Sequence, residues 1–385
     1  MRTALGILCA LALSAAAFEW APAPLLGVAA LWILLCGAAA ARARSRSARL
    51  IGVYTGAALL TLAGFETYLL ATRGSAPGHE FRGSYRDGGY FVDDAVLGYA
   101  PRPGITVNST ELVDGKPIYS VSYGIDEKGL RRVPQPTGRP SGSVVFFGCS
   151  VTFGEGLEDD ETLPSLVAAA LRDRYRVYNF GFHGYGPHQM LAAIESGRME
   201  GIVEEPPVVV VYQALSHHIE RAAGRTDWDR HGPRYRLRED GSVERAGFFN
   251  EERSPFASLA HRWLERALVY RQLFGSERPM RKEDLALMVG IVLAARDQIH
   301  ASHPDARFEV LLWGRQEDGR SRKIDEALRQ AGVSVHRVRE ILPGYEEDPV
   351  RYQLSPFDQH PNAAAQQILS RYVVESIVEA EGGGS

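Results

Sequence analysis

The chain has 385 residues, a formal net charge of −4, and 45% apolar against 23% charged residues. This composition is typical of a folded protein and excludes a disordered one, and the length is sufficient for two or three domains. Because the chain carries no basic excess, we expect no nucleic-acid partner.

The first seventy residues contain three apolar runs, Thr3 to Phe18, Ala21 to Ala41 and Leu50 to Ala71. A helix needs about 20 residues to cross the hydrocarbon of a bilayer. The second and third runs are long enough and the first is marginal, so residues 1–73 are predicted to form three transmembrane helices. The alternative for the first run is a cleaved signal peptide, because the small residues Ser14 to Ala17 would suit a cleavage site.

Charge predicts the orientation of these spans. The loop between the second and third runs carries four arginines and no acid: Arg42, Arg44, Arg46 and Arg49. Short arginine-rich loops stay in the cytoplasm, and Arg2 places the N-terminus on the same side. The sequence therefore predicts a multi-pass protein of the inner (cytoplasmic) membrane, with a cytoplasmic N-terminus and everything after about Arg73 extracytoplasmic or periplasmic.

Two regions flank the main part of the exterior chain. Residues 74–140 are rich in Gly, Pro and Tyr, and the alternation from Pro117 to Tyr123 predicts a small β-rich region. This region is either a stalk or a contributor to substrate contacts. At the other end, residues 381–385 contain the stretch Gly-Gly-Gly-Ser, which we interpret as an expression linker.

Residues 141–380 alternate between short apolar runs and helical patterns. Strands are predicted at Val144–Phe147, Val177–Phe180, Val208–Tyr212, Phe308–Trp313 and Val333–Val338, and helices at Glu161–Arg172, Gln189–Arg198, Glu283–Ser302, Ser321–Ala331 and Asn362–Glu379. Continuous apolar strands that alternate with helices indicate a parallel sheet with both faces covered. The prediction is a five-stranded α/β/α three-layer sandwich.

An insertion at residues 220–281 interrupts this alternation. We predict a hairpin over Arg234–Phe249 and an amphipathic helix over Phe256–Leu273. Long insertions after a strand of such a sheet commonly form lids or substrate walls.

Four strand ends carry candidate site residues, and ligands of open parallel sheets bind at these carboxyl ends. Ser150 follows the first strand within a Gly-rich turn, and no lysine follows it as it would in a phosphate-binding loop. The second strand leads to Gly184, and the third leads to the stretch Gln213 to Ile219. Asp358 and His360 precede the last helix, where the Asp either orients the imidazole or serves only as a cap.

Together these stretches resemble the SGNH (GDSL-like) hydrolase superfamily, whose sandwich is flavodoxin-like. GCSVTFGEG is similar to its first block, NFGFHG to its second and DQHPN to its last. The resemblance implies Ser150 as nucleophile, His360 as base and Asp358 as its partner. It also implies an oxyanion hole that contains the N–H groups of Ser150 and Gly184. The short form Asp-x-His is also carried by the alginate O-acetyltransferase relatives of the superfamily.

Two positions depart from this pattern. Cys149 replaces the usual Asp, and we expect its side chain to point into the core, which disfavours it as a rival nucleophile. The third block reads LSHH where the family has Gly-x-Asn-Asp, so the Asn that donates to the oxyanion is missing. His218 is the favoured replacement, with His217 and Gln213 as alternatives.

The expected function is that of a membrane-anchored serine esterase or O-acyltransferase that forms an acyl-Ser150 intermediate. The expected substrate is a glycan or exported polysaccharide ester, and the three spans suggest a membrane protein partner such as an acyl-donor enzyme. The alternative is a decayed module that binds a glycan or scaffolds a membrane complex.

We expect no cofactor, disulfide or metal. Of the three cysteines, only Cys149 lies outside the apolar runs, so the exterior part cannot form an intramolecular disulfide. No spacing in the sequence fits a zinc site. A metal-dependent hydrolase is disfavoured because no acidic cluster accompanies its candidate ligands: His183, His188, His217 and His218.

Overall fold

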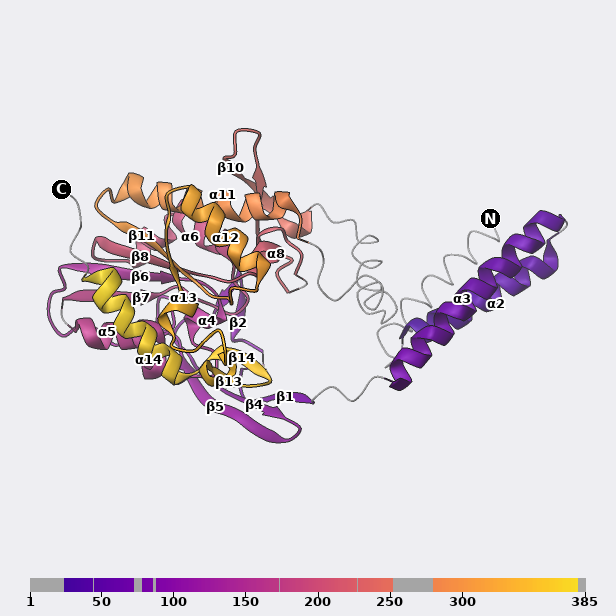
Figure 1. The fold of residues 1–385 in the computed structure, drawn as a ribbon, viewed down its shortest axis with the longest axis horizontal. Helices are drawn as coiled ribbons and strands as arrows, with labels where there is room; N and C mark the ends of the chain where they lie inside the picture. The colour runs from indigo at the N-terminus through magenta and orange to yellow at the C-terminus, as the bar shows by residue number, and fades with distance from the viewer. Residues whose placement is uncertain are drawn as a thin grey trace. The chain divides into compact units, whose positions relative to one another are not determined.

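The computed structural model describes residues 24–43, 45–72, 78–85, 88–172, 174–226, 228–251 and 280–379. They fall into two compact units (Figure 1). The first contains the described residues up to 72. The second contains 78–251 together with 280–379, so the β-rich region and the main sheet belong to one unit.

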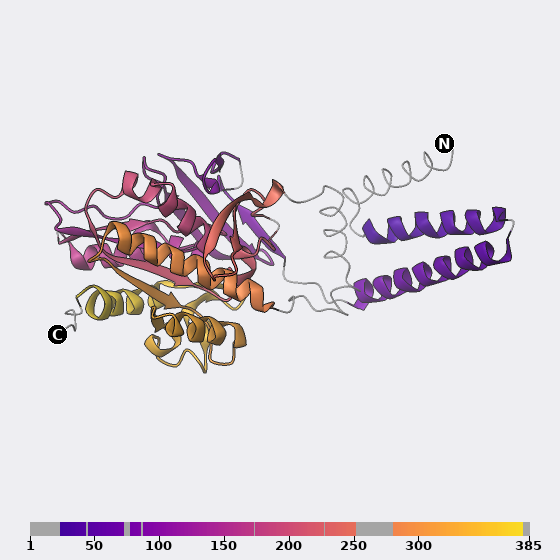
Figure 2. The ribbon, with the colours of Figure 1, turned by 90° about the horizontal axis from the view of Figure 1, so that it is seen from above.

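The first unit is a pair of packed helices, α2 (Pro24–Arg42) and α3 (Arg46–Thr72) (Figure 2). Their backbones approach closely, because a Cβ added at Gly52 would lie 2.8 Å from the Cβ of Ala40. Helix α3 is long and apolar enough to cross a membrane. The predicted span Thr3–Phe18 lies outside the described residues, so the arrangement with three spans stays a prediction.

The second unit is built on a five-stranded sheet with the order β12-β11-β8-β6-β7. Its strands are β6 (Gly142–Phe147), β7 (Tyr175–Asn179), β8 (Pro207–Ala214), β11 (Arg307–Leu312) and β12 (Ser334–Arg337). All neighbouring pairs are parallel. The chain places β7 on one side of β6 and β8 on the other, so the order reverses at β6. In such sheets the ligand crevice forms at this reversal, outside the carboxyl ends of the strands.

Helices cover both faces of the sheet (Figure 1). In β6, Val145 packs in one core cluster, whereas Val144 and Phe146 pack in the other. The first cluster also contains residues of α6 (Pro187–Glu195), α11 (Lys282–Ser302) and α12 (Gly319–Gln330), and the second contains residues of α5 (Leu163–Leu171) and α14 (Ala363–Tyr372). The predicted fold class, an α/β/α sandwich with five parallel strands, is confirmed.

Several boundaries differ from the prediction. Helix α14 begins after Asn362, whose side chain accepts a hydrogen bond from the Ala365 N–H at 3.1 Å, and it passes at Val373 into a π-helical turn that ends at Val378.

The predicted hairpin in the insertion is confirmed as β9 (Pro233–Leu237) and β10 (Val243–Phe248). The predicted helix Phe256–Leu273 lies outside the described residues.

The β-rich region forms a three-stranded antiparallel sheet of β1 (His79–Arg82), β4 (Thr106–Val113) and β5 (Lys116–Gly124). A separate pair is formed by β2 (Phe91–Asp94) and β3 (Gly98–Pro101). The strand predicted at Pro117–Tyr123 is therefore confirmed as part of β5.

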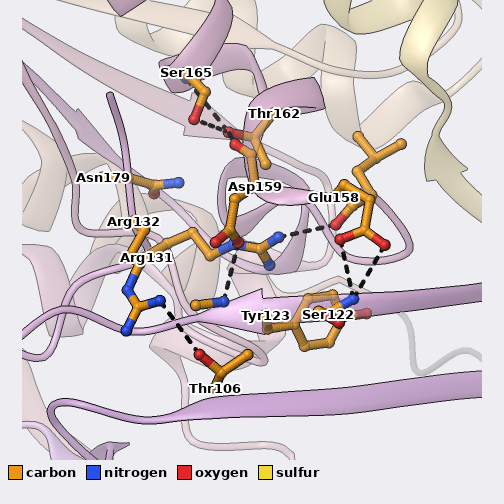
Figure 3. A network of polar contacts seen from close by, with 12 residues as sticks. Thr106, Ser122, Tyr123, Arg131, Arg132, Glu158, Asp159, Thr162, Ser165 and Asn179 are labelled. Carbon is orange, nitrogen blue, oxygen red and sulfur yellow. Dashed lines mark hydrogen bonds and ion pairs between the residues drawn. The ribbon is translucent and has the colours of Figure 1, made fainter. Parts of the chain in front are cut away.

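A buried arginine attaches this region to the segment that follows β6 (Figure 3). The Arg131 side chain is fully buried, and its Nε lies 2.8 Å from the Asp159 carboxylate. Its guanidinium lies 4.5 Å from the ring centroids of both Tyr123 and Phe153. Because Phe153 lies one helical turn after Ser150, this contact fixes the segment that carries the serine.

Candidate active site

Ser150 begins the one-turn helix α4 (Ser150–Phe153) directly after β6. The turn needs glycine at position 148, because a Cβ there would collide with the Thr152 hydroxyl. The Ser150 side chain lies at the carboxyl end of the sheet, and the residue is 7% exposed. Its backbone N–H has no acceptor among the described residues.

The structure brings Ser150, His360 and Asp358 together in one hydrogen-bonded row. His360 Nε2 lies 2.8 Å from Ser150 Oγ, and His360 Nδ1 lies 2.6 Å from Asp358 Oδ1. The same carboxylate oxygen accepts the His360 backbone N–H at 2.9 Å. Asp358 therefore fixes both the backbone and the ring of the histidine. With Nδ1 donating to Asp358, Nε2 is the nitrogen that accepts the serine proton.

A second carboxylate, Glu155, lies beside the same imidazole. Glu155 Oε2 is 3.5 Å from His360 Nε2 and accepts a 2.8 Å hydrogen bond from His183 Nδ1. The Tyr90 hydroxyl is hydrogen-bonded to the other nitrogen of His183 at 3.0 Å, which fixes that ring. The resemblance gave Glu155 no role, and no spacing marks it. The only signal is a carboxylate in the turn after the nucleophile.

These charges shift the titration of the site. Burial alone lowers the pKa of His360, but the Glu155 and Asp358 carboxylates outweigh it and raise the pKa to about 9. Burial raises the pKa of Glu155, yet His183 and His360 hold it at about 2. The pKa of Asp358 is lowered because its hydrogen bond to His360 outweighs its burial. Both carboxylates thus favour the protonated form of the His360 imidazole.

A third carboxyl group reaches the site from the β-rich region. Glu111 on β4 is 3% exposed, and its Oε1 lies 2.7 Å from His79 Nδ1 on β1. Burial and a hydrogen bond to Asp358 raise the pKa of Glu111. Glu111 was not expected from the sequence, because its approach depends on how β4 packs against the last block.

Two backbone N–H groups lie where the resemblance predicts oxyanion donors. Gly184 has a φ of +76°, and a Cβ there would lie 2.6 Å from the Trp228 indole nitrogen, so only glycine fits. Like the Ser150 N–H, the Gly184 N–H has no acceptor among the described residues. Ser150 and Gly184 line the same cavity.

The favoured third donor, His218, is wrongly placed for that role. It begins α8 (His218–Ala222), is 0% exposed and lies 2.6 Å from the Tyr212 hydroxyl. Burial keeps its pKa well below the usual range, so the ring is neutral. It lines neither cavity at Ser150. His218 is buried because the first residue of α8 faces the core.

The two alternatives also fall short. Gln213 is 0% exposed, and its carbonyl accepts the Trp313 indole N–H at 2.9 Å. Like His218, it lines neither cavity. His217 is exposed and lines one cavity.

Cys149 and three of the four candidate metal ligands are held by contacts within the protein. Cys149 is 1% exposed and packs in the second core cluster, as expected from its position. His183, His188 and His218 bond to three different partners, namely Glu155, Asp229 and Tyr212. Among the described residues, no group of His, Cys, Asp or Glu suits a metal ion.

Two cavities meet at the row of Ser150 and His360. The first, here named the acidic cavity, has a volume of about 710 Å³ and includes Glu111, Glu317 and Asp318 in its lining. The second, the aromatic cavity, has about 590 Å³ and is lined by rings of Tyr85, Phe91, Tyr99 and Trp228. Ser150, Glu155, Arg221 and His360 line both cavities.

No family model and no curated protein matches the chain. Among solved structures, the chain is similar to a putative lipolytic protein of the G-D-S-L family from Desulfitobacterium hafniense, with 12% identity, 60% of this chain and 98% of that chain covered, and a TM-score of 0.33. It is also similar to TesA, with 16% identity, coverage of 60% and 96%, and a TM-score of 0.34. An acetyl xylan esterase from Geobacillus stearothermophilus shows 12% identity, coverage of 62% and 95%, and a TM-score of 0.33.

Proposed function

We propose that the chain is a membrane-anchored, extracytoplasmic serine esterase or O-acyltransferase that works through an acyl-Ser150 intermediate. The observation that carries this proposal is the row Ser150–His360–Asp358, with contacts of 2.8 and 2.6 Å. It lies next to two backbone N–H groups without acceptors, those of Ser150 and Gly184. A nucleophile, an oriented base and oxyanion donors are the parts that acyl transfer requires.

The reaction follows from this geometry. His360 Nε2 removes the Ser150 proton as Oγ attacks the ester carbonyl, and the carbonyl electrons move to the oxygen. When the tetrahedral intermediate collapses, His360 gives its proton to the leaving alcohol, and the acyl group stays on Ser150. In the second half, water or a second hydroxyl group attacks the acyl-enzyme, and His360 again accepts and returns the proton. Water gives an esterase and a sugar hydroxyl gives an acyltransferase.

The proposed substrate is a glycan ester, on the basis of the cavity lining. Carboxylates in the acidic cavity can accept hydrogen bonds from sugar hydroxyls. The aromatic cavity offers exposed ring faces, with Phe91 41% and Trp228 59% exposed, against which the apolar face of a sugar ring can pack. Cavities of this size suit small-molecule or short oligomer ligands.

Membrane anchoring is proposed from α3 and the arginines beside it. Helix α3 has the length and apolarity of a span, and four arginines lie in the sequence around its first residue: Arg42, Arg44, Arg46 and Arg49. The proposed orientation places the catalytic unit outside the cytoplasm. A membrane partner that supplies acyl groups would fit the acyltransferase form of the proposal.

The test is labelling of the full-length protein in detergent with a fluorophosphonate probe, beside Ser150→Ala and Cys149→Ala variants. We expect labelling of the wild type and of Cys149→Ala, and none of Ser150→Ala. A folded wild-type protein that does not react with the probe would refute the proposed enzymatic function. It would favour the alternative of a decayed glycan-binding or scaffold module, for which the missing third-block Asn is the supporting observation.

A further inference from the structure

We propose that the guanidinium of Arg221 is the third donor of the oxyanion hole and takes the place of the missing third-block Asn. This inference rests on the proposed acyl-Ser150 chemistry. Arg221 lies on α8, which follows the loop after β8 and therefore occupies the same strand end as the expected donor. It lines both cavities together with Ser150 and His360.

Arg221 is held beside Gly184 by two contacts. Its Nη1 donates to the carbonyl of Tyr185, the residue after Gly184, at 2.7 Å. Its guanidinium lies 5.7 Å from the centroid of the Trp228 ring, and the Trp228 indole N–H points to the Gly184 carbonyl at 3.4 Å. The guanidinium, the indole and the oxyanion glycine thus form one assembly.

The charge of Arg221 has no acidic partner. No carboxylate of the described residues forms an ion pair with it, and its Nε is buried without a hydrogen-bond acceptor. Two neighbours differ in this respect: Arg225 pairs with Asp284 at 2.6 Å, and Arg320 pairs with Glu220 at 2.5 Å. A guanidinium has five N–H donors, and the described residues provide an acceptor for one of them, on Nη1.

An unpaired guanidinium at this place suits a negative charge that exists only during the reaction. When Ser150 Oγ adds to the carbonyl carbon, one electron pair of the C=O bond moves to the oxygen, which becomes an oxyanion. The N–H groups of Ser150 and Gly184 and the guanidinium of Arg221 then donate to it. Arg221 keeps its protons throughout, and the pair returns to the C=O bond when the intermediate collapses. A charged donor gives shorter and stronger hydrogen bonds than the amide that it replaces.

The test compares Arg221→Met, Arg221→Lys and Arg221→Ala with the wild type on a small neutral ester such as p-nitrophenyl acetate. Loss of one oxyanion donor lowers kcat by about 10²- to 10³-fold. We expect Arg221→Met to lower kcat by this factor with little change in KM. The rate constant of Ser150 phosphonylation should fall by the same factor. Arg221→Lys should retain part of the rate, and added guanidinium ion should restore part of it to Arg221→Ala. Arg236→Met, at an exposed position on β9, is the matched control.

The outcomes separate this inference from the proposed function. If wild-type Ser150 does not react with the fluorophosphonate, both are refuted. If wild-type Ser150 reacts but Arg221→Met keeps the wild-type kcat and phosphonylation rate, the oxyanion role alone is refuted. A rise of KM confined to anionic esters would also refute it, because Arg221 would then bind a substrate anion. If Arg221→Met does not fold, the kcat of Arg221→Lys and the rescue of Arg221→Ala by guanidinium ion test the oxyanion role instead.

Discussion

Replacement of Glu155 by Gln should lower the pKa of the catalytic base. Glu155 Oε2 lies 3.5 Å from His360 Nε2, and this carboxylate helps to raise the pKa of His360 to about 9. Two unit charges at that separation interact by roughly 5 kcal/mol at an effective dielectric constant of about 20. One pKa unit corresponds to about 1.4 kcal/mol, so the upper bound of the shift is about three units. Since solvent and the Gln dipole compensate in part, we expect a fall of about one to two units.

The consequence for the rate differs above and below this pKa. The wild-type kcat/KM should increase as the pH rises through about 9, because only neutral His360 accepts the Ser150 proton. At lower pH the resting enzyme and the transition state both carry a proton on His360, and Glu155 stabilises both. We therefore expect the low-pH limb of Glu155→Gln to equal or exceed that of the wild type. Its plateau at high pH should be lower by up to about 10- to 100-fold.

The assay is kcat/KM for a neutral ester between pH 6 and 10.5, with spontaneous hydrolysis subtracted. Glu347→Gln, at an exposed position that lines neither cavity, is the matched control and should reproduce the wild-type profile. An unchanged midpoint in Glu155→Gln, with an unchanged melting temperature, would refute the electrostatic role of Glu155. A drop of equal size at every pH would show instead that Glu155 acts on substrate binding or on the geometry of His183.

Two further predictions concern the partners of the site. Asp358→Asn keeps the size of the side chain but cannot hold His360 in the required tautomer, so kcat for a neutral ester should fall by about 10³- to 10⁴-fold; a loss below tenfold would contradict the assignment. Arg131→Met removes one partner of a buried ion pair, which costs about 3–5 kcal/mol, and the free energy of unfolding from denaturant titration should fall by about 3 kcal/mol because the Asp159 side chain is 36% exposed. A change below about 1 kcal/mol would show that Arg131 does not attach the β-rich region.

The sequence predicted the sheet because its strands are continuous apolar runs. VVVVY in β8 has no polar face, and such a run is stable only when helices cover both sides of the sheet. His360 lies on β14 (Asp358–Pro361), which pairs with β13 (Gln353–Ser355) outside the parallel sheet, so its place beside Ser150 was predicted by the family resemblance. The position of Ser150 at the carboxyl edge of the sheet was predictable from the strand pattern. The same logic could not rank His217 against His218. Neighbouring residues point in different directions, and only the start of α8 decides which one is buried.

Glu155, Glu111 and Arg221 could not be found by pattern. Glu155 acts on His360 only because the last block folds back beside α4. Glu111 comes from a strand of another sheet. It lies in the same cavity as Asp358 because the two sheets pack together, and its distance from Asp358 along the sequence does not predict this. Arg221 stands among several arginines of the insertion, and it is distinguished by having no acidic partner among the residues that the structure describes, which a sequence does not record.

The contribution of β4 to the site also defines where this protein can be divided. Glu111 and the rings of Phe91 and Tyr99 precede the first strand of the parallel sheet, yet they line the cavities at the nucleophile. A form obtained by cutting just before β6 would lose one wall of the proposed active site, together with the rings of Tyr90 and Tyr123 that pack against His183. A form released between α3 and β1, whether by a protease or by gene design, would keep all the described residues that line the two cavities at Ser150. The described lining of the cavities thus comes from the second unit alone, and the β-rich region belongs to the proposed catalytic unit.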